Sequence, residues 1–554
     1  MSENEEIDLE NVKVIFPDGE NKIYPKPLAL SELLKHQSLS SPKIISLMVN
    51  GEVKSINDTI NVGIAKITPV LLDSREGASM YRRTLVHIFA TAVNKVYSKQ
   101  FNVIVHHSVN NGYLVRKVDE KDFTEEEINN IKEKMTELIK NDLKIEEVSL
   151  SHQEAINYFK SINHSFSVSL IETNNNDIVK CNCLDKFLTL FFRPLGKSTG
   201  VITDFDVRLS SDKHSLLLLF PTNLKPIPKD LKEIEIKLTT QSYQESFEYS
   251  KLINVKCVGD WNKVVISNKE KLRELILTMN MHHERQISKI AEKIAEKVLN
   301  GKVKFVGIAG PSASGKTTFT KKLRIALQSK GIEPAIMCMD DYYKNRKDVP
   351  KDEKGNYDFE CLEALRVDDF NKDLKKLFKG EKVNKSVFDF ISGTYSFSKT
   401  DILQLPPKDS GKTGIVLCEG LHGIDEKGTP SIPRDEKFFI YIAPLSPIKC
   451  DEYNFYADHV IRLFRRAIRD FRTRGRNASG TLSHFFNVSK GEEKYIFPIH
   501  YIIYILKSDG FQPFFNSRFC FWFSSFSPFH TKITNYNFGF NYVIFNVLIS
   551  FTNS

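Results

Sequence analysis

The stretch GIAGPSASGKTTFTKKL, residues 307–323, limits the choice of fold for this chain of 554 residues. Its spacing, Gly310-x-x-x-x-Gly315-Lys316-Thr317, follows the apolar run 303–308 and precedes a segment with helical character. Glycine reaches backbone angles that are closed to other residues, so the amides of such a loop can converge on phosphate oxygens at the start of a helix. The pattern therefore predicts a strand, a phosphate-binding loop (P-loop) and a helix.

The loop residues are candidate ligands of ATP and of its Mg²⁺ ion. Lys316 is expected to reach the terminal phosphates, and Thr317 is expected to place its hydroxyl on Mg²⁺. An ordinary glycine-rich turn between a strand and a helix is the alternative. The predicted ATP-binding residues of the loop are Gly310, Pro311, Ser312, Ala313, Ser314, Gly315, Lys316, Thr317 and Thr318.

The composition indicates a soluble protein of several domains. The length suggests three or four units at roughly 150 residues each. The formal net charge of +9 is modest for this length and does not by itself argue for nucleic acid. The eight cysteines form no CxxC pair, which favours reduced thiols. The acidic start MSENEEIDLE resembles neither a secretory signal nor a mitochondrial presequence, so we expect a cytoplasmic protein.

The amino-terminal half is predicted to be rich in β-structure. Residues 12–16 and 22–24 flank the turn Pro17-Asp18-Gly19-Glu20, which is typical of a β-hairpin in a small β domain, residues 1–75. A second, α+β domain is expected at residues 76–266. Thr124 begins a capping box, so an amphipathic helix is predicted from there to Asn141. The predicted strands of this domain are residues 166–171, 215–220 and 233–238.

A connecting helix is predicted at residues 267–300, beginning with Ser267-x-x-Glu270 and carrying one apolar stripe. Beyond it, residues 301–498 alternate between apolar strand candidates and helical stretches. This alternation is typical of an α/β domain with a doubly wound parallel sheet. The strand candidates are residues 304–308, 335–339, 414–418 and 437–442.

Acidic residues follow two of these strand candidates. Asp340 comes after the second candidate, at the edge of the sheet where the phosphates would lie. A carboxylate there can take the proton of an attacking hydroxyl and can hold Mg²⁺, so Asp340 is the predicted base. Glu419 follows the third candidate and is predicted to orient the Mg²⁺ water shell. The alternatives are a helix-capping Asp and a turn carboxylate.

A run of arginines lies between residues 462 and 476. Such runs are usually solvated helix faces. Beside a P-loop, we expect a lid whose guanidinium groups offset the charge on a transferring phosphoryl group. Within it, Arg469 is a predicted catalytic residue and Arg474 a predicted ATP ligand.

Three motifs that follow the loop resemble those of the uridine kinase and phosphoribulokinase family of P-loop kinases. They are Asp340-Asp341-Tyr342-Tyr343, Glu419-Gly420-Leu421-His422 and Arg465-Arg466-x-x-Arg469-Asp470-x-x-x-Arg474-Gly475-Arg476. The resemblance covers residues 304–498. It implies that Asp340 is the base for the 5′-hydroxyl of a nucleoside, with transfer from ATP in pyrimidine salvage.

The same resemblance implies a substrate-binding set. Asp358 corresponds to the residue that holds the ribose hydroxyls, and Arg466 and Arg476 approach the substrate or the phosphates. Tyr343, Phe388 and Phe390 complete the set.

One departure from the family concerns the base of the nucleoside. The family's Tyr-Asp-Phe followed by His is replaced by Phe388-Asp389-Phe390-Ile391-Ser392-Gly393. The aromatic walls remain, but the phenol and the imidazole are lost, and with them the means of selecting a pyrimidine by hydrogen bonds. Uridine or cytidine is the predicted acceptor, and another small hydroxyl compound, such as a sugar phosphate, is the alternative.

The amino-terminal half resembles parts of threonyl-tRNA synthetases: a ubiquitin-like β-grasp TGS domain, then the second additional domain. The editing site of those enzymes uses HxxxH and a distant Cys and His. Here the sequence reads His87-Ile-Phe-Ala-Thr91 and Cys181-Asn-Cys183-Leu-Asp185, so we expect neither editing nor Zn²⁺. His87 is predicted to be a core or interface histidine. The alternative to a kinase is a nucleotide-regulated binding protein that contacts RNA through this half.

Residues 499–554 form an atypical tail, rich in Phe and Asn, with no charge after Lys532. Asparagines interrupt its apolar stretch 533–551, which argues against a membrane helix, because unpartnered amides are costly in lipid. We interpret the tail as non-native sequence that replaces the last elements of the kinase. We expect no membrane contact. The sequence leaves open whether the protein forms a homo-oligomer.

Overall fold

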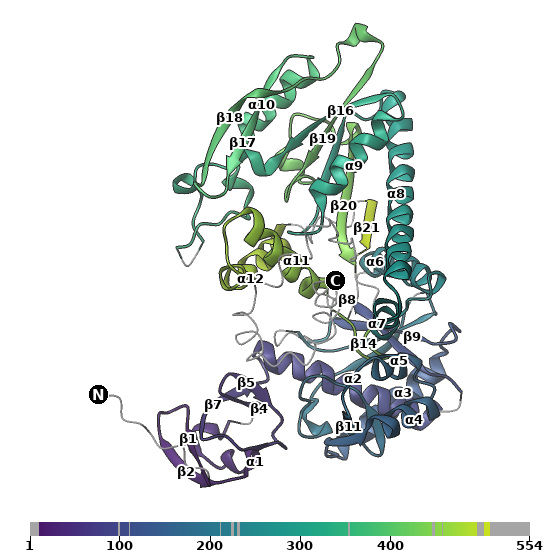
Figure 1. Ribbon diagram of the computed structural model, residues 1–554, viewed down its shortest axis with the longest axis vertical. Helices are drawn as coiled ribbons and strands as arrows, with labels where there is room; N and C mark the ends of the chain where they lie inside the picture. Colours follow the sequence, from purple (N-terminus) through teal and green to yellow (C-terminus); the bar gives the residue numbers. More distant parts are fainter. Residues whose placement is uncertain are drawn as a thin grey trace.

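The described part of the chain forms three successive regions, which Figure 1 shows from the lower left to the top. The computed structural model describes residues 10–41, 43–97, 100–109, 111–210, 212–222, 226–229, 233–352, 355–445, 449–456, 458–495 and 504–509. We call residues 10–72 the amino-terminal region, residues 75–267 the middle region and residues 303–509 the P-loop region.

The amino-terminal region is a mixed β-sheet with a short helix. Its elements are β1 (Asn11–Ile15), β2 (Asn21–Pro25), β3 (Leu28–Ala29), α1 (Leu30–Leu33), β4 (Ile44–Val49), β5 (Glu52–Lys54), β6 (Thr59–Ile60) and β7 (Ile64–Leu71). The main sheet has the order β2-β1-β7-β4-β5. β1 pairs antiparallel with β2, which confirms the predicted hairpin, and parallel with β7. The TGS-like β-grasp assignment stays a prediction.

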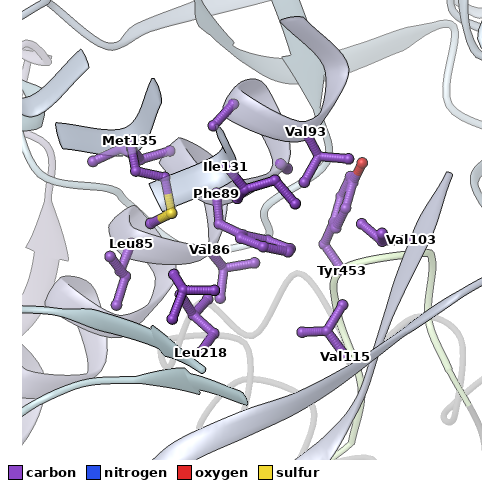
Figure 2. Close-up of a cluster of buried hydrophobic side chains, with 14 of the residues drawn as sticks. Leu85, Val86, Phe89, Val93, Val103, Val115, Ile131, Met135, Leu218 and Tyr453 are labelled. Carbon is purple, nitrogen blue, oxygen red and sulfur yellow. The ribbon is translucent and has the colours of Figure 1, made fainter. Parts of the chain in front are cut away.

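The middle region combines a four-stranded antiparallel sheet, a three-stranded sheet and six helices among the described residues. Its elements are α2 (Arg75–Tyr97), β8 (Val103–Val109), β9 (Gly112–Lys117), α3 (Glu125–Lys140), β10 (Glu146–Ser151), α4 (His152–Ser161), α5 (Ser165–Glu172), β11 (Ile178–Leu184), β12 (Phe187–Thr189), β13 (Asp206–Leu209), β14 (Ser215–Leu219), α6 (Glu233–Leu252) and α7 (Val258–Ser267). Figure 2 shows its core, where Phe89 of α2 and Ile131 of α3 lie near Val115 and Leu218 of the sheet.

Sequence predictions for the middle region are partly confirmed. The helix from Thr124 has the expected capping box with Glu127, and the strand expected at residues 215–220 is β14. The strands predicted at residues 166–171 and 233–238 are wrong, since these residues lie in α5 and α6. In the sequence, Phe166, Val168 and Leu170 alternate with two serines, which is typical of a strand, yet every residue from 166 to 171 is buried in a helix.

The connecting helix, α8 (Lys269–Leu299), spans two cores. Leu272 and Met279 pack in a cluster of the middle region, whereas Ile287 and Ile294 pack on the parallel sheet. The predicted cap at Ser267 is wrong, because the side chain of Asn268 accepts the hydrogen bond from Glu270 N at 2.7 Å. Ser267 instead ends α7.

The P-loop region contains a parallel sheet in the order β16-β19-β15-β20-β21. The strands are β15 (Phe305–Ala309), β16 (Ile332–Cys338), β19 (Thr413–Glu419), β20 (Lys437–Leu445) and β21 (Tyr504–Asp509). Helices cover both faces: α8 and α9 (Lys316–Gln328) on one, α10 (Val367–Phe378) on the other. The side chains of β15 alternate between the two faces of the sheet. Val306 and Ile308 pack in the core with α8 and α9, whereas Phe305 and Ala309 pack in the core with α10. The four predicted strands are confirmed.

Beside the sheet lie a hairpin and two helices (Figure 1). They are β17 (Val383–Asp389), β18 (Thr394–Leu403), α11 (Asp458–Thr473) and α12 (Ala478–Tyr495).

Part of the predicted tail belongs to the sheet. β21, at residues 504–509, pairs in parallel with β20 as its outer neighbour. Residues 499–503 and 510–554, including the apolar stretch 533–551, lie outside the described residues. Among the described helices, none is both long and apolar enough to cross a membrane.

Candidate active site

The predicted P-loop lies between β15 and α9. Gly315, with φ of +101°, is the N-cap residue of α9, so the loop turns into the helix through a conformation that favours glycine. Gly310 is required for a different reason, because a Cβ there would stand 2.2 Å from the carbonyl oxygen of Ile442 in β20. The loop is therefore pressed against the neighbouring strand, with its amides at the amino end of α9.

Lys316 and Thr317 extend from the first turn of α9 toward polar groups. The Lys316 ammonium donates to the carbonyl oxygen of Gly310 at 2.9 Å, so its side chain turns back over the loop. The Thr317 hydroxyl hydrogen-bonds to the carboxylate of Glu419. Burial raises the pKa of Glu419, and the charge of Asp340 adds to this, while Lys316 and the Thr317 hydrogen bond oppose it.

The strand register explains why Asp340 and Glu419 are neighbours. β16 and β19 are adjacent and parallel, and Cys338 at the end of one pairs with Glu419 at the end of the other. Asp340 follows two residues later, in the 3-10 turn Met339–Tyr342. That turn has Cys338 as its N-cap residue, so the interpretation of Asp340 as a cap is wrong. Both carboxylates stand at the carboxyl edge of the sheet, beside the loop.

The two aspartates of the motif differ in their contacts. The Asp341 carboxylate accepts a long hydrogen bond from Phe388 N, 3.4 Å, which ties the turn to β17. The charges of Asp340 and Asp341 both act on Glu419, and the charge of Asp340 also acts on Tyr343 and Arg474. Asp341 therefore has a contact that supports the fold, and the role of Asp340 as the base stays a prediction.

The arginine helix, α11, lies against the loop. Arg465 donates to the carbonyl oxygen of Ala313 at 2.9 Å. Arg466 donates to the Ser312 hydroxyl at 2.5 Å, and Arg469 approaches the same oxygen at 3.4 Å. Arg466 is buried, so the alternative of a solvated helix face is wrong for this side of the helix. Buried Asp470 pairs with Arg466 and Arg469 and fixes their orientation.

The predicted aromatic residues come together. The rings of Tyr343 and Phe388 lie 5.5 Å apart, and those of Phe388 and Phe390 lie 5.2 Å apart, between centroids. The Arg474 guanidinium stands 4.1 Å from the centre of the Phe390 ring. A cation over an aromatic face is attracted by the ring, more strongly where water is excluded.

Asp358 and Arg476 are less closely tied to this cluster. Asp358 is half-buried and accepts a hydrogen bond from Glu360 N at 3.0 Å. Its segment reaches the aromatic cluster through Phe359, 5.6 Å from Tyr343 between ring centroids. Arg476, beyond the end of α11, is exposed. Their roles in substrate binding stay predictions.

Two charged residues near the loop, Glu492 and Glu360, were missed, and Arg462 was predicted only as a member of the arginine run. The Glu492 carboxylate of α12 accepts the N–H of Ser312 at 2.9 Å and pairs with Arg462 at 2.6 and 2.7 Å. Burial raises the pKa of Glu360 to about 7; Arg466 opposes this, and Glu492 is the next group that adds to it. Glu360 adjoins a predicted motif and could have been suspected. Glu492 and Arg462 lie on two different helices, and their contact depends on how those helices pack.

His87 lies in a different environment. It is fully buried in α2, and its Nδ1 is 2.8 Å from the hydroxyl of Thr189. Burial lowers the pKa of His87 to about 3, which keeps the ring neutral. The Thr91 hydroxyl donates to the His87 carbonyl oxygen. The prediction of a core histidine is confirmed.

The loop, the acidic strand ends and the parallel sheet define a P-loop α/β domain. Residues 305–501 match the model of the Phosphoribulokinase / Uridine kinase family, and this part of the chain is a domain of that family. A uridine kinase of Chlamydia pneumoniae is 28% identical over 194 residues, which are 35% of this chain and 76% of the relative. The solved structure of a possible uridine kinase from Bacillus stearothermophilus covers 38% of this chain and 96% of its own, with 16% identity and a TM-score of 0.24.

The amino-terminal half is similar to threonine–tRNA ligases. A threonine–tRNA ligase of Thermotoga petrophila is 31% identical over 196 residues, which are 35% of this chain and 30% of the relative. The chain thus matches less than a third of the length of that ligase.

Proposed function

We propose that residues 301–498 act as an ATP-dependent kinase that phosphorylates the 5′-hydroxyl of uridine, or of cytidine or a related nucleoside, in pyrimidine salvage. The observation that carries the proposal is the meeting of three elements. The P-loop ends at Lys316, the carboxylates of Asp340 and Glu419 stand at the adjacent strand ends, and arginines of α11 contact the loop. Phosphoryl transfer depends mainly on such positioning and on charge.

The loop would hold the nucleotide and its metal ion. Residues 310–318 provide backbone amides and hydroxyls for the phosphates, and Arg474 lies near the place where the nucleotide would meet the acceptor. The Thr317 hydroxyl and the carboxylates of Glu419 and Asp340 form an oxygen donor set, which suits Mg²⁺. Mg²⁺ would neutralise phosphate charge there.

Asp340 would accept the proton of the acceptor hydroxyl. Its charge acts on both Glu419 and Tyr343, which supports a place near the proposed metal and acceptor sites. Arg469, with Arg466 on the same hydroxyl of Ser312, would offset negative charge as the phosphoryl group moves. Asp358 would hold the ribose hydroxyls, and Phe388 and Phe390 would pack on the base.

A specific observation also favours the sugar phosphate as a second candidate acceptor. Arg474 covers the face of Phe390, so the aromatic cluster carries a positive charge on this side. The Tyr and His that the family would use for hydrogen bonds to the base are absent from residues 388–393 of this chain. A guanidinium in such a place matches a phosphate well.

For the other half, we propose a TGS-like domain at residues 1–75 and a synthetase-like domain at residues 76–266, without editing activity. The similarity to threonine–tRNA ligases supports this division, and the buried pair of His87 and Thr189 argues against a catalytic use of His87. Contact with RNA would then be a binding role of this half. A cytoplasmic location and a homo-oligomeric state stay predictions.

An acceptor screen with the full-length chain tests the kinase proposal. ADP release is measured with MgATP and uridine, cytidine, adenosine or a pentose phosphate, and Lys316→Ala serves as the background control. Fastest release with a pyrimidine nucleoside is expected. Release with the pentose phosphate alone would select the second candidate, and no release above the control with any acceptor would refute both.

A further inference from the structure

A segment of the P-loop region is built into the core of the middle region. Residues 449–456, which we call the strap, lie between β20 and α11. Tyr453 of the strap is only 6% exposed and belongs to the core of the middle region. Figure 2 shows its ring near Val93, Val103 and Val115. Cys450 of the strap is buried in a second cluster of the same region.

Two backbone hydrogen bonds and one bond from a side-chain amide, that of Asn454, join the strap to separate elements of the middle region. The N–H of Val258, the first residue of α7, donates to the carbonyl oxygen of Lys449 at 2.8 Å. The N–H of Val105 in β8 donates to the carbonyl oxygen of Glu452 at 2.8 Å. The Asn454 amide donates to the carbonyl oxygen of Leu190 at 2.6 Å. The strap is therefore fixed to the middle region at its first residue, at its centre and at Asn454.

The carboxylate of Glu452 accepts three hydrogen bonds from α5. It accepts the N–H of Phe166 at 2.8 Å, the N–H of Ser167 at 3.2 Å and the hydroxyl of Ser167 at 2.5 Å. These donors stand at the amino end of α5, where the helix favours negative charge. The Glu452 side chain is only 3% exposed, so removing a donor would leave a buried charge less satisfied.

Both ends of the strap lead to elements that support the P-loop. Before it, β20 pairs directly with β15, with Tyr441 opposite Ala309, the last residue before the loop. After it, α11 begins at Asp458, two residues past Tyr456, and carries the arginines that contact Ser312 and Ala313. A shift of the strap would therefore be passed to the arginine helix.

We infer that Glu452 and Tyr453 are positioning residues of the phosphoryl-transfer site, through which the middle region sets the placement of α11 against the P-loop. The inference rests on the proposed function for its consequence in catalysis. Coupling between two sites is reciprocal, so a nucleotide that stabilises α11 on the loop also stabilises the strap in the middle region. The synthetase-like half is then a structural part of the kinase.

Two serines of α5 test the inference without changing the P-loop region. Ser167→Ala removes the hydroxyl that donates to Glu452. Ser165→Ala is the matched control, because Ser165 is exposed on the same turn of the helix. In the full-length chain, the Kd for MgATP is measured by calorimetry, and the backbone of α11 is followed by hydrogen exchange.

We expect Ser167→Ala to raise the Kd for MgATP about fivefold and to speed exchange in α11, while Ser165→Ala changes neither. A merely structural role of Ser167 would lower the Tm and leave both readings unchanged, which would overturn the inference. Glu452→Gln should act in the same direction and more strongly, about twentyfold. If Glu452→Gln does not fold, Ser167→Ala alone decides.

The outcomes separate this inference from the proposed function. A wild-type chain that binds no MgATP refutes the proposed function, and exchange in α11 still decides whether the strap positions the helix. A wild-type chain that phosphorylates a nucleoside, with unchanged Kd and exchange in Ser167→Ala, keeps the function and refutes the coupling.

Discussion

The P-loop and the surroundings of His87 use polar residues in opposite ways. At the loop, side chains from two strand ends and two helices converge, and Glu419 is held where burial raises its pKa. Around His87, by contrast, Nδ1 of the ring pairs with the Thr189 hydroxyl inside an apolar core. A polar group directed to a shared edge of the sheet is available to a ligand, whereas one paired within the core stabilises the fold. Four predictions test this contrast.

The largest effects are expected from Asp340 and Lys316. Asp340→Asn should lower kcat about 10³-fold, because it removes the proposed proton acceptor and keeps the shape of the side chain. Lys316→Ala should be at least as damaging. Asp341→Asn is the matched control, with a loss of less than about tenfold, since Asp341 contacts β17. Steady-state kinetics with circular dichroism decide, and an active Asp340→Asn would show that the base is another residue.

A smaller effect is expected from the metal side. Glu419→Gln should raise the Mg²⁺ concentration required for half-maximal activity by about 10- to 100-fold, since it removes one charged oxygen donor beside Thr317. Thr317→Ser, which keeps the hydroxyl, should remain close to wild type. A titration of activity with Mg²⁺ measures both. An unchanged requirement in Glu419→Gln would assign Glu419 to the fold.

Glu360 should give the site a pH-dependent stability. Because its pKa in the folded chain is about 7 against an ordinary 4.5, the unfolded chain releases this proton first as the pH rises. The free energy of unfolding should therefore fall between pH 4.5 and 7, by about 2 kcal/mol for a partly exposed group. Glu360→Gln should remove this part of the slope in urea unfolding, and the exposed Glu363→Gln should not. Equal slopes in Glu360→Gln and wild type would contradict the assignment.

The smallest effect on catalysis is expected at His87. His87→Leu should leave kcat within about twofold of wild type but cost about 1–2 kcal/mol of stability, because the Thr189 hydroxyl loses its partner. The double variant His87→Leu/Thr189→Val should recover much of that loss, since apolar groups then replace both partners. Thermal unfolding of the wild type and of both variants measures these changes in stability. A large loss of kcat in the single variant would contradict the structural role of His87.

Predictions from the sequence succeeded where local pattern and position agree. The spacing of Gly310 and Gly315 between a strand and a helix, and the acidic residues after two strands, were found because parallel strands end at a common edge. The failures have physical causes as well. Residues 233–238 alternate like a strand yet belong to a helix of 20 residues. Phe166, Val168 and Leu170 likewise alternate with serines, but the serines are buried too, so this period-2 pattern did not mark the two faces of a strand.

The sequence by itself determined the P-loop, the strands that carry it and the acidic residues beside it, because each depends on residues close together in the chain. Only the tertiary structure decided how Glu492 meets Ser312, and how Glu452 meets Ser167 across 285 positions of sequence. Such contacts follow from the packing of cores, and a charged residue in a helix carries no mark of its distant partner. The strap therefore joins two halves that the sequence presents as separate.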